Sequence, residues 1–428
     1  MILPSAVRSR SALRRILLLP VLVFLSFSGA LAQTTGTGAP LGLLLTWQSD
    51  PLTTMTIDWH TAGGTGTAAI APALDFRPVG EASWRTAPSP ETRPFPHSDR
   101  LIHRVELTEL QPGATYEFRV SEGGRVYRFR TMPADLARPL RFAVGGDVRH
   151  SQNMMERTNR ALLPYDPDFI VWGGDLAYDD GRPDRVERWY EFLDAIKRTL
   201  VTPEGRVIPV LAAIGNHEVR GAYHHNLEDY APGDAWQREY APFYYGLLAF
   251  PGHPGYGVMD FGGYLSVLLL DTDHSGPIDG AQTSWLARTL AERRNVPHVF
   301  PSYHVPAYPS VRNPEGDTHR RVREHWVPLF EENGLKLVFE AHDHVYKRTF
   351  PIREGQVHPG GVVYVGDGAW GVSTREIGRS HREATWYLDQ GHADRHFILV
   401  TLHGAQQHLL VVNEDGQVID EYPATPRR

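Results

Sequence analysis

Three segments decide the fold of this chain: LRFAVGGD at residues 140–147, FIVWGGD at 169–175 and VIPVLAAIGN at 207–216. Each is a short apolar run that ends in a turn with a polar side chain. Runs of this length are typical of strands that are buried on both faces of a sheet. Residues 186–200, between the second and third runs, have apolar side chains at helical spacing. Strands that alternate with helices predict an α/β layer fold.

The segments on either side extend this pattern. Residues 41–131 contain short alternating strands separated by Pro-Gly and Gly-Gly turns, which predicts a β-sandwich of the fibronectin type III kind. Residues 133–139 form the predicted linker to the α/β part. Further strands and one further helix are expected at 257–271 (two strands), 282–293 (helix), 396–402 and 408–412.

Residues 1–32 have the features of an export signal. Four Arg precede the apolar run 16–27, and Ala30-Leu31-Ala32 follows it, as in a cleaved secretory signal. The run is shorter than the roughly 20 residues of a spanning helix, so we expect cleavage after Ala32 and no stable membrane anchor. The mature chain is expected in a periplasm or outside the cell, and Arg14-Arg15 leaves Sec and twin-arginine export both open.

The net charge and the lack of cysteine restrict the partners and the metal ligands that we expect. The net charge is −7, and removal of residues 1–32, which contain four Arg and no acid, makes it −11. Binding of a nucleic acid duplex needs basic residues to neutralise phosphates, so we expect no nucleic acid partner. The chain has no cysteine, so any metal must be bound by oxygen and nitrogen atoms.

Side chains that can bind metal ions follow the predicted strands: Asp147, Asp175, Asn216, His304, His342 and His344. Each alone is weak evidence, because Gly-Asp is a common turn and an isolated histidine is usually structural. Ligands of α/β sheets gather at the carboxyl ends of strands, and these donor types suit hard divalent or trivalent ions. His342 and His344, two residues apart on an expected extended segment, would point the same way. One carboxylate can bridge two ions roughly 3.5–4 Å apart, so the set predicts a binuclear metal site.

Several motifs resemble those of a known family, the calcineurin-like metallophosphoesterases, and within it the purple acid phosphatases. They are GGDVR (145–149), GGDLAY (173–178), GNHE (215–218), the segment ending at His304, and AHDHVY (341–346). PGATYEFRV and YRFRTMP also resemble the sandwich domain of that family. The resemblance covers nearly all of the mature chain. It implies a four-layer α/β/β/α catalytic domain over 140–415, preceded by a fibronectin type III-like domain over 41–132.

The resemblance also implies how the metals are held. The first ion would be bound by Asp147, Asp175, Tyr178 and His344. The second would be bound by Asp175, Asn216, His304 and His342, with Asp175 bridging. Tyr178 is the residue that would distinguish a purple acid phosphatase centre from those of other phosphoesterases, because a phenolate suits ferric iron. The implied centre is Fe3+ paired with Fe2+, Zn2+ or Mn2+. The alternative for Tyr178 is a loop aromatic that only packs near the site.

The expected activity is hydrolysis of small phosphate monoesters, of the acid phosphatase type, by a metal-bound hydroxide. His217 is the candidate general acid for the leaving group. Glu218 either orients an imidazole or is a solvent-facing ion-pair partner. The alternatives are a phosphodiesterase or nucleotide pyrophosphatase with the same ligands, and a metal-stabilised binding protein without catalysis. The natural substrate, the pH optimum, the second metal and the oligomeric state are left open.

The sequence departs from the family pattern at several positions. Ala341 replaces a usual glycine before His342. Arg149 stands where glycine is common, and either contacts a substrate phosphate or lies on the rim of the site. The stretch 309–313 lacks a histidine that some family members use to bind substrate. His224 and His225 could replace it, although such a pair is more often solvated surface.

Overall fold

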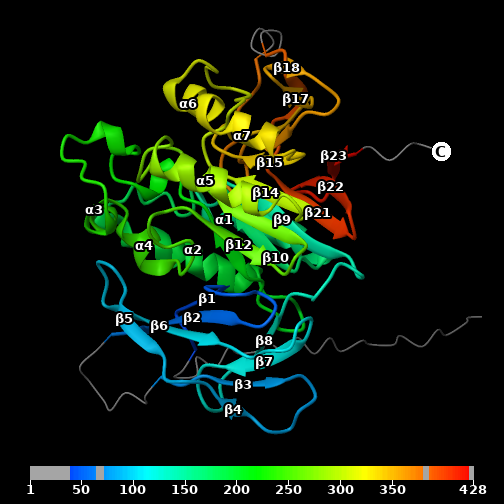
Figure 1. Ribbon diagram of the computed structural model, residues 1–428. Helices are drawn as coiled ribbons and strands as arrows, with labels where there is room; N and C mark the ends of the chain where they lie inside the picture. Colours follow the sequence, from blue (N-terminus) through cyan, green and yellow to red (C-terminus); the bar gives the residue numbers. More distant parts are fainter. Residues whose placement is uncertain (1–38, 64–71, 379–384, 424–428) are drawn as a thin grey trace, which may run out of the picture. The chain divides into compact units, whose positions relative to one another are not determined.

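The computed structural model describes residues 39–63, 72–378 and 385–423. The predicted export signal, residues 1–32, lies outside them. The described chain folds as a β-sandwich followed by a mixed α/β part, as predicted (Figure 1).

The described residues of the sandwich form two antiparallel sheets of four strands each, in the orders β1-β2-β6-β5 and β4-β3-β7-β8. The sequence pattern predicts five of these strands, at 43–47, 55–59, 102–107, 115–120 and 126–130. It misses β3, β4 and β5, which are only two to four residues long and lack buried apolar side chains. The bounds are β1 Gly42–Thr46, β2 Met55–Ala62, β3 Asp75–Pro78, β4 Arg85–Thr86, β5 Glu91–Pro94, β6 Arg100–Leu107, β7 Thr115–Arg119 and β8 Tyr127–Arg130.

The α/β part contains two larger sheets. The first has the order β11-β10-β9-β21-β22-β23, in which β9, β10 and β11 are parallel. These are the three runs quoted at the start, and β23 extends the sheet beyond residue 415. The bounds are β9 Leu140–Gly145, β10 Phe169–Trp172, β11 Val210–Ala212, β21 His396–His403, β22 Gln406–Asn413 and β23 Val418–Tyr422.

The second sheet has the order β12-β13-β14-β15-β19-β16-β20, in which β13, β14, β15 and β19 are parallel. Two short strands, β17 Ile352–Arg353 and β18 Gln356–Val357, form a separate hairpin. The remaining bounds are β12 Gly257–Phe261, β13 Leu265–Leu269, β14 His298–Ser302, β15 Leu337–Glu340, β16 Tyr346–Thr349, β19 Val363–Gly366 and β20 Leu388–His392.

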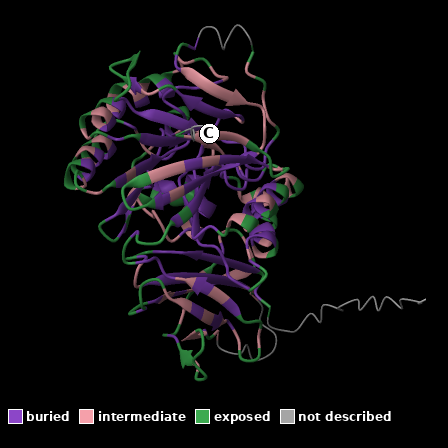
Figure 2. Ribbon diagram, turned by 90° about the vertical axis from the view of Figure 1, so that its right-hand side faces the viewer, coloured by how far each residue is buried: buried purple, intermediate pink, exposed green. Residues whose placement is uncertain are grey.

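Alternate side chains of the strands lie in different hydrophobic clusters, which defines four layers. Phe142, Phe169 and Phe339 are buried in one cluster between the two sheets. Ile170 and Trp172 instead join a cluster with the first helices, and Val338 and Tyr364 join one with the later helices. Figure 2 shows the buried residues along the strands of both parts. The order is therefore helix, sheet, sheet, helix, as the family resemblance implies.

The outer layers are formed by helices with one apolar face each. α1 Gln152–Leu162 and α2 Val186–Thr199 cover the first sheet, and α5 Ala281–Glu292, α6 Asp317–His325 and α7 Val327–Glu332 cover the second. Two short helices, α3 Asp234–Tyr240 and α4 Pro242–Leu247, lie in the segment after β11. None of the helices within the described ranges combines the length and the apolar character that crossing a bilayer requires.

The sandwich shares its core with the α/β part. The ring of Trp47, which follows β1, meets the rings of Phe169 and Phe261 edge-on at 5.8 and 5.7 Å. Arg104 on β6 forms an ion pair with Asp58 and donates a hydrogen bond of 2.8 Å to the carbonyl oxygen of Leu247. Apolar packing and polar contacts therefore both join the two parts.

Candidate metal centre

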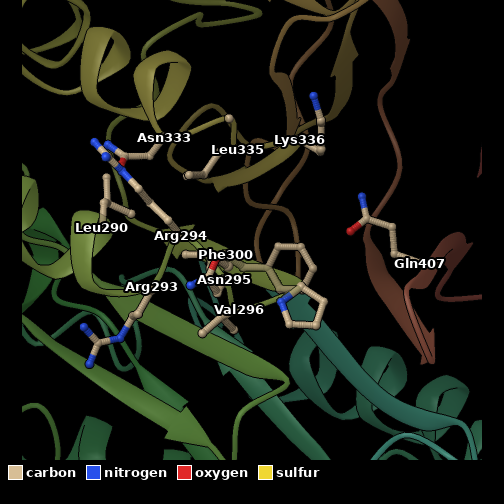
Figure 3. A pocket seen from close by; sticks show the side chains of 13 residues that line it. Leu290, Arg293, Arg294, Asn295, Val296, Phe300, Asn333, Leu335, Lys336 and Gln407 are labelled. Atoms are coloured by element: carbon tan, nitrogen blue, oxygen red, sulfur yellow. The ribbon is translucent and has the colours of Figure 1, made fainter.

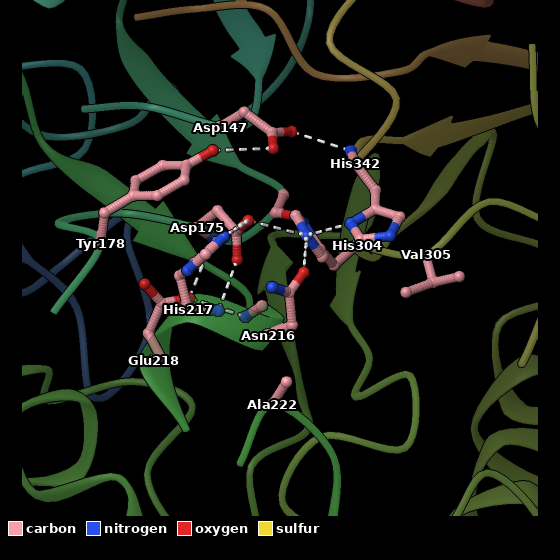
Figure 4. Close-up of polar contacts among 12 residues, drawn as sticks. Asp147, Asp175, Tyr178, Asn216, His217, Glu218, Ala222, His304, Val305 and His342 are labelled. Carbon is pink, nitrogen blue, oxygen red and sulfur yellow. Dashed lines mark hydrogen bonds and ion pairs between the residues drawn. The ribbon is translucent and has the colours of Figure 1, made fainter. Parts of the chain in front are cut away.

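The six predicted strand-end side chains come together at one edge of the two sheets. Asp147, Asp175 and Asn216 follow the parallel strands β9, β10 and β11 of the first sheet. His304 follows β14 and His342 follows β15 of the second sheet. Because the inner faces of the sheets pack together, their carboxyl ends lie side by side. Figure 4 shows the side chains of Asp147, Asp175, Asn216, His304 and His342 pointing toward one another.

The backbone at these strand ends is left-handed. Asp147, Asp175 and Tyr178 have φ values of 55°, 56° and 59°, and His342 and His344 have values of 83° and 61°. The expectation of an extended His342–His344 segment is therefore wrong. The turn at these residues directs the two imidazoles to different partners, which an extended backbone would not do. Non-glycine residues rarely adopt this conformation, and clusters of them occur at functional sites.

One group of donors converges on a single atom, Nε2 of His304. Oδ2 of Asp175 lies 3.2 Å from it, Oδ1 of Asn216 lies 3.0 Å from it, and Nδ1 of His342 lies 3.0 Å from it. A ring nitrogen carries either one hydrogen or one lone pair, so it cannot bond all three partners at once. Asp175, His304 and His342 form the group of His and acidic side chains, among the described residues, that could hold a metal ion.

A second group of donors lies around Oδ1 of Asp147. Nε2 of His344 lies 2.9 Å from it and the Tyr178 hydroxyl lies 3.1 Å from it. The Tyr178 hydroxyl is also 3.3 Å from Nε2 of His344, so the three atoms form a triangle. Tyr178 is therefore more than a packing residue, because its hydroxyl points into the cluster.

The spacing of both groups fits metal coordination. Two ligand atoms that bind one ion at right angles, each about 2.1 Å away, are about 3 Å apart. The donor separations in both groups are close to that value. The donors are carboxylate, amide and phenol oxygens together with imidazole nitrogens, and these suit hard and borderline ions. The residues present therefore fit a pair of cations.

The electrostatics of the described residues also favour cations. Burial lowers the pKa of His304, but the charges of Asp175 and Asp147 outweigh it and raise the value to about 9. Burial and the charge of Asp147 raise the pKa of the Tyr178 phenol well above its usual range. Asp147 and Asp175 are 0% and 1% exposed. Buried carboxylates require compensating positive charge, which a pair of bound cations would supply.

His217 lies beside the centre and is not one of its donors. Its backbone N–H donates to Oδ1 of Asp175 at 2.8 Å, its Nδ1 pairs with Asp180, and its ring stacks on Tyr178 at 4.2 Å. Burial lowers its pKa, but the charge of Asp175 and the bond to Asp180 raise it to about 9. A pocket of about 230 Å³ adjoins this ring and is lined by Asp180, Asn216, His217, Val219, Gly221 and Ala222.

Glu218 has a role that neither prediction describes. Its carboxylate accepts the backbone N–H groups of Asp175 at 2.9 Å, Leu176 at 2.6 Å and Gly215 at 2.8 Å. It touches no imidazole, and it is only 1% exposed, so both expectations are wrong. Glu218 holds the loop after β10 against the loop after β11, and it thereby fixes the backbone that carries the bridging carboxylate.

Arg149 and His224 also differ from expectation. Arg149 is 4% exposed and pairs with Glu191 on α2, so it reaches neither substrate nor rim. His224 is buried with Nδ1 2.8 Å from the carbonyl oxygen of Asp273, whereas His225 is exposed.

Ala341 fits because two glycines face it. A Cβ added at Gly146 would lie 2.6 Å from the Ala341 methyl group, and one added at Gly173 would lie 3.4 Å from it. The two glycines therefore provide the space that the extra methyl group occupies.

Sequence patterns alone miss three residues of this centre. Asp180, which holds His217, follows Tyr178 by two positions in an acidic pair, and that pair is the signal that could have revealed it. Asp343 lies between the paired histidines and accepts three backbone N–H groups from residues 310–312. Gly368 passes so close to Asp147 that a Cβ there would lie 1.7 Å from Oδ2. The last two contacts depend on tertiary packing, and no local pattern reveals them.

A second pocket, of about 310 Å³, lies elsewhere (Figure 3). Its lining includes Arg293, Arg294, Phe300, Lys336 and Gln407, and no carboxylate. It borders the amino ends of β14 and β15, opposite to the ends that carry His304 and His342. The polar centre therefore lies at the other edge of the same sheet.

Comparison with known proteins agrees with this arrangement. The calcineurin-like phosphoesterase family matches residues 140–346, and the purple acid phosphatase N-terminal domain matches residues 40–131. The structure of purple acid phosphatase PPD1 from yellow lupin (Lupinus luteus) seeds superposes with a TM-score of 0.74 at 19% identity, over 90% of this chain and 74% of that one. This likeness shows that the two chains have the same fold.

Curated relatives are similar at about a quarter of positions. Purple acid phosphatase 18 of Arabidopsis thaliana is 27% identical over 287 residues, which cover 62% of this chain and 58% of the relative. Acid phosphatase type 7 of Mus musculus is 26% identical over 353 residues, which cover 75% of this chain and 76% of the relative. The chain thus spans little more than half the length of the plant relative.

Gly368→Ala should weaken metal binding. Its φ is +67° and its Cβ would collide with Oδ2 of Asp147, so this carboxylate must move. Losses of a group that orients a ligand cost about 10–100-fold in metal affinity, and we expect a decrease in that range, measured as metal ions per chain after dialysis against buffered metal. Gly404→Ala is the matched control, with a φ of +56° and open space around its Cβ. Unchanged metal content in Gly368→Ala would contradict the placement of Asp147 in the centre.

Proposed function

We propose that this chain, which belongs to the calcineurin-like phosphoesterases and has the domain arrangement of their purple acid phosphatase branch, hydrolyses phosphate monoesters at a pair of metal ions. The observation that carries the proposal is the convergence of donors on two points, one beside Asp147 and one beside His304. The substrate would be a small organic phosphate. The position of His217 between this centre and an open pocket supports it further.

The chain's own donors divide between two ions. Asp147, Tyr178 and His344 would hold the first ion, and Asn216, His304 and His342 would hold the second. Asp175 would bridge them, because its Oδ2 faces His304 while Glu218 fixes its backbone. Two bound cations supply Lewis acidity, lower the pKa of a bound water and offset the charge that develops at phosphorus.

His217 would donate the proton that the leaving group needs. Asp180 holds Nδ1, and the stack on Tyr178 fixes the plane of the ring. Nε2 is then the atom left to face the substrate, 3.9 Å from Oδ2 of Asp175. An imidazole held in this way acts as a general acid when its proton reaches the departing oxygen. The pocket of about 230 Å³ beside it would receive the leaving group.

The ferric assignment rests on Tyr178. Burial and the charges of Asp147 and Asp175 raise the pKa of its phenol well above the usual range, so only a strong local cation would favour the phenolate. Ferric iron supplies such a charge, and the partner ion would be Fe2+, Zn2+ or Mn2+. Export of the chain, expected from residues 1–32, stays a prediction.

Purified protein reconstituted with iron and zinc tests the proposal. We expect it to hydrolyse p-nitrophenyl phosphate and to hydrolyse bis-p-nitrophenyl phosphate much more slowly. Faster turnover of the bis-ester would favour the phosphodiesterase alternative, in which the same ligands serve a different pocket. Bound metal with no hydrolysis of either ester at any pH would favour a binding protein.

His217→Ala should retain its metals and lose turnover selectively. For an alkyl phosphate, whose leaving group needs a proton, we expect kcat to fall about 100-fold or more, and for p-nitrophenyl phosphate less than about tenfold. His225→Ala, at an exposed histidine of the same loop region, is the control. An equal loss for both esters would remove the general acid role from His217.

Tyr178→Phe tests the iron–phenolate contact. In protein that contains iron, we expect a visible charge-transfer band in the parent chain and its loss in the variant. Tyr256→Phe, at a tyrosine that packs against Trp285, should keep the band. If Tyr178→Phe keeps both its iron and the band, Tyr178 is not a ligand.

A further inference from the structure

A buried histidine, His274, lies beside the candidate metal centre and is not one of its donors. It follows β13 and is 0% exposed. The centroid of its ring lies 5.5 Å from that of His304 and 5.0 Å from that of Tyr223. Buried polar side chains are normally hydrogen-bonded within the protein. The partners of the two ring nitrogens therefore indicate what this residue does.

Nδ1 of His274 holds the carbonyl oxygen of Ala222. The two atoms are 3.0 Å apart, and a carbonyl oxygen can only accept, so Nδ1 carries the hydrogen. Ala222 lines the pocket of about 230 Å³ beside His217. Figure 4 shows Ala222 next to Asn216, on the side away from Asp147. His274 therefore fixes one wall of this pocket from the second sheet.

The wall has an unusual backbone that such a contact helps to hold. Ala222 has a φ of 70°, in the left-handed region that non-glycine residues rarely adopt. Its N–H donates to the carbonyl oxygen of Val219 at 2.9 Å, which closes a tight turn. Two positions later, the N–H of His224 donates to the carbonyl oxygen of Asp273 at 3.1 Å. The loop is thus tied to the segment after β13 at two points.

Nε2 of His274 bonds a hydroxyl that supports a proposed metal ligand. Burial lowers the pKa of His274 to about 3, so the ring is neutral and Nε2 accepts from the Thr272 hydroxyl, 3.0 Å away. The oxygen of that hydroxyl accepts the backbone N–H of Val305 at 3.0 Å. Val305 directly follows His304. One imidazole therefore connects the pocket wall with the strand end that carries a donor of the second ion.

His274 is itself held in place by Asp271. One oxygen of this carboxylate accepts the N–H of His274 at 2.8 Å, and the other accepts the N–H of Ser275 at 2.9 Å. All three residues are buried. The position of the imidazole is therefore set by the protein before any substrate binds, as a precise binding site requires.

We propose that His274 is a positioning residue that fixes the Ala222 wall of the leaving-group pocket and thereby selects small apolar leaving groups. The inference rests on the proposed function, because it specifies the substrate of the same site. Three residues that line the pocket, Val219, Gly221 and Ala222, offer no polar side chain. Apolar surface that is buried there contributes to binding in proportion to its area, so the affinity depends on where Ala222 lies.

Two amide variants separate the two bonds of His274. The side-chain nitrogen of asparagine can take the place of Nδ1, and the amide of glutamine can take that of Nε2. His274→Asn therefore keeps the donor to Ala222, whereas His274→Gln loses it. Both variants place an uncharged polar side chain in the buried site. A general loss of stability should affect both alike, and a loss of the pocket wall should affect only His274→Gln.

Equilibrium binding measures the selectivity without relying on catalysis. Full-length protein in saturating zinc is titrated by calorimetry with benzylphosphonate, which resembles an aryl phosphate and is not hydrolysed, and with methylphosphonate, which lacks the ring. We expect the parent chain to bind benzylphosphonate about tenfold more tightly, because the ring is buried. His274→Gln should lower this preference about fivefold, the effect of one lost hydrogen bond. His274→Asn should keep the preference within about twofold of the parent value.

His298→Gln is the matched control. His298 is also buried, and its Nε2 lies 2.9 Å from a backbone carbonyl oxygen, that of Gly404. It stands at the amino end of β14, at the edge of the sheet opposite to the metal centre. This variant should bind both phosphonates as the parent chain does.

The outcomes distinguish this inference from the proposed function. Equal affinity of the parent chain for both phosphonates, or an equal loss of preference in His274→Gln and His274→Asn, would overturn the positioning role. A preference that only His274→Gln loses would support this role even if no ester were hydrolysed. The absence of hydrolysis would then count only against the proposed activity.

Discussion

Two carboxylates, those of Asp147 and Asp175, are buried almost completely at the edge where the sheets meet, and the surrounding structure compensates their charge. Each accepts one backbone N–H at 2.8 Å, from His342 and His217 respectively. Their remaining oxygens face imidazoles and a phenol. An uncompensated carboxylate in such a place would cost several kcal/mol. A pair of cations between these donors would supply the compensating positive charge.

A further set of buried charges holds the loops that carry these donors. Glu218 joins two strand ends of the first sheet through three backbone bonds. Glu340, at the end of β15, accepts from Tyr303, from the backbone of Ala307 and from Lys347. Lys347 is fully buried, so its charge is balanced by Glu340. The donor positions are thus set by a rigid polar network, as preorganised sites require.

Much of the fold and most of the donors could be predicted because they depend on local sequence. The runs before Asp147 and Asp175 are apolar on both faces, and their turns end in carboxylates. Contacts between distant segments cannot be predicted from local sequence. Two examples are the contact of Asp343 with residues 310–312 and the close approach of Gly368 to Asp147. The position of Arg149 could not be predicted for the same reason, because its partner Glu191 is on a helix 42 positions away. The left-handed turns of His342 and His344 depend on a tertiary hydrogen bond, from the His344 N–H to the carbonyl oxygen of Asp367.

The aromatic contact between Trp47, Phe169 and Phe261 has a consequence for how this architecture can change over time. Because one apolar cluster runs through the sandwich and the space between the sheets, removal of the N-terminal part would also remove part of the core that supports the strands of the α/β part. A chain without it would expose Phe169 on the strand that precedes Asp175, and would become prone to self-association. Selection on the two parts is therefore coupled. Substitutions on the inward face of the sandwich would therefore disturb the strands that support the donors.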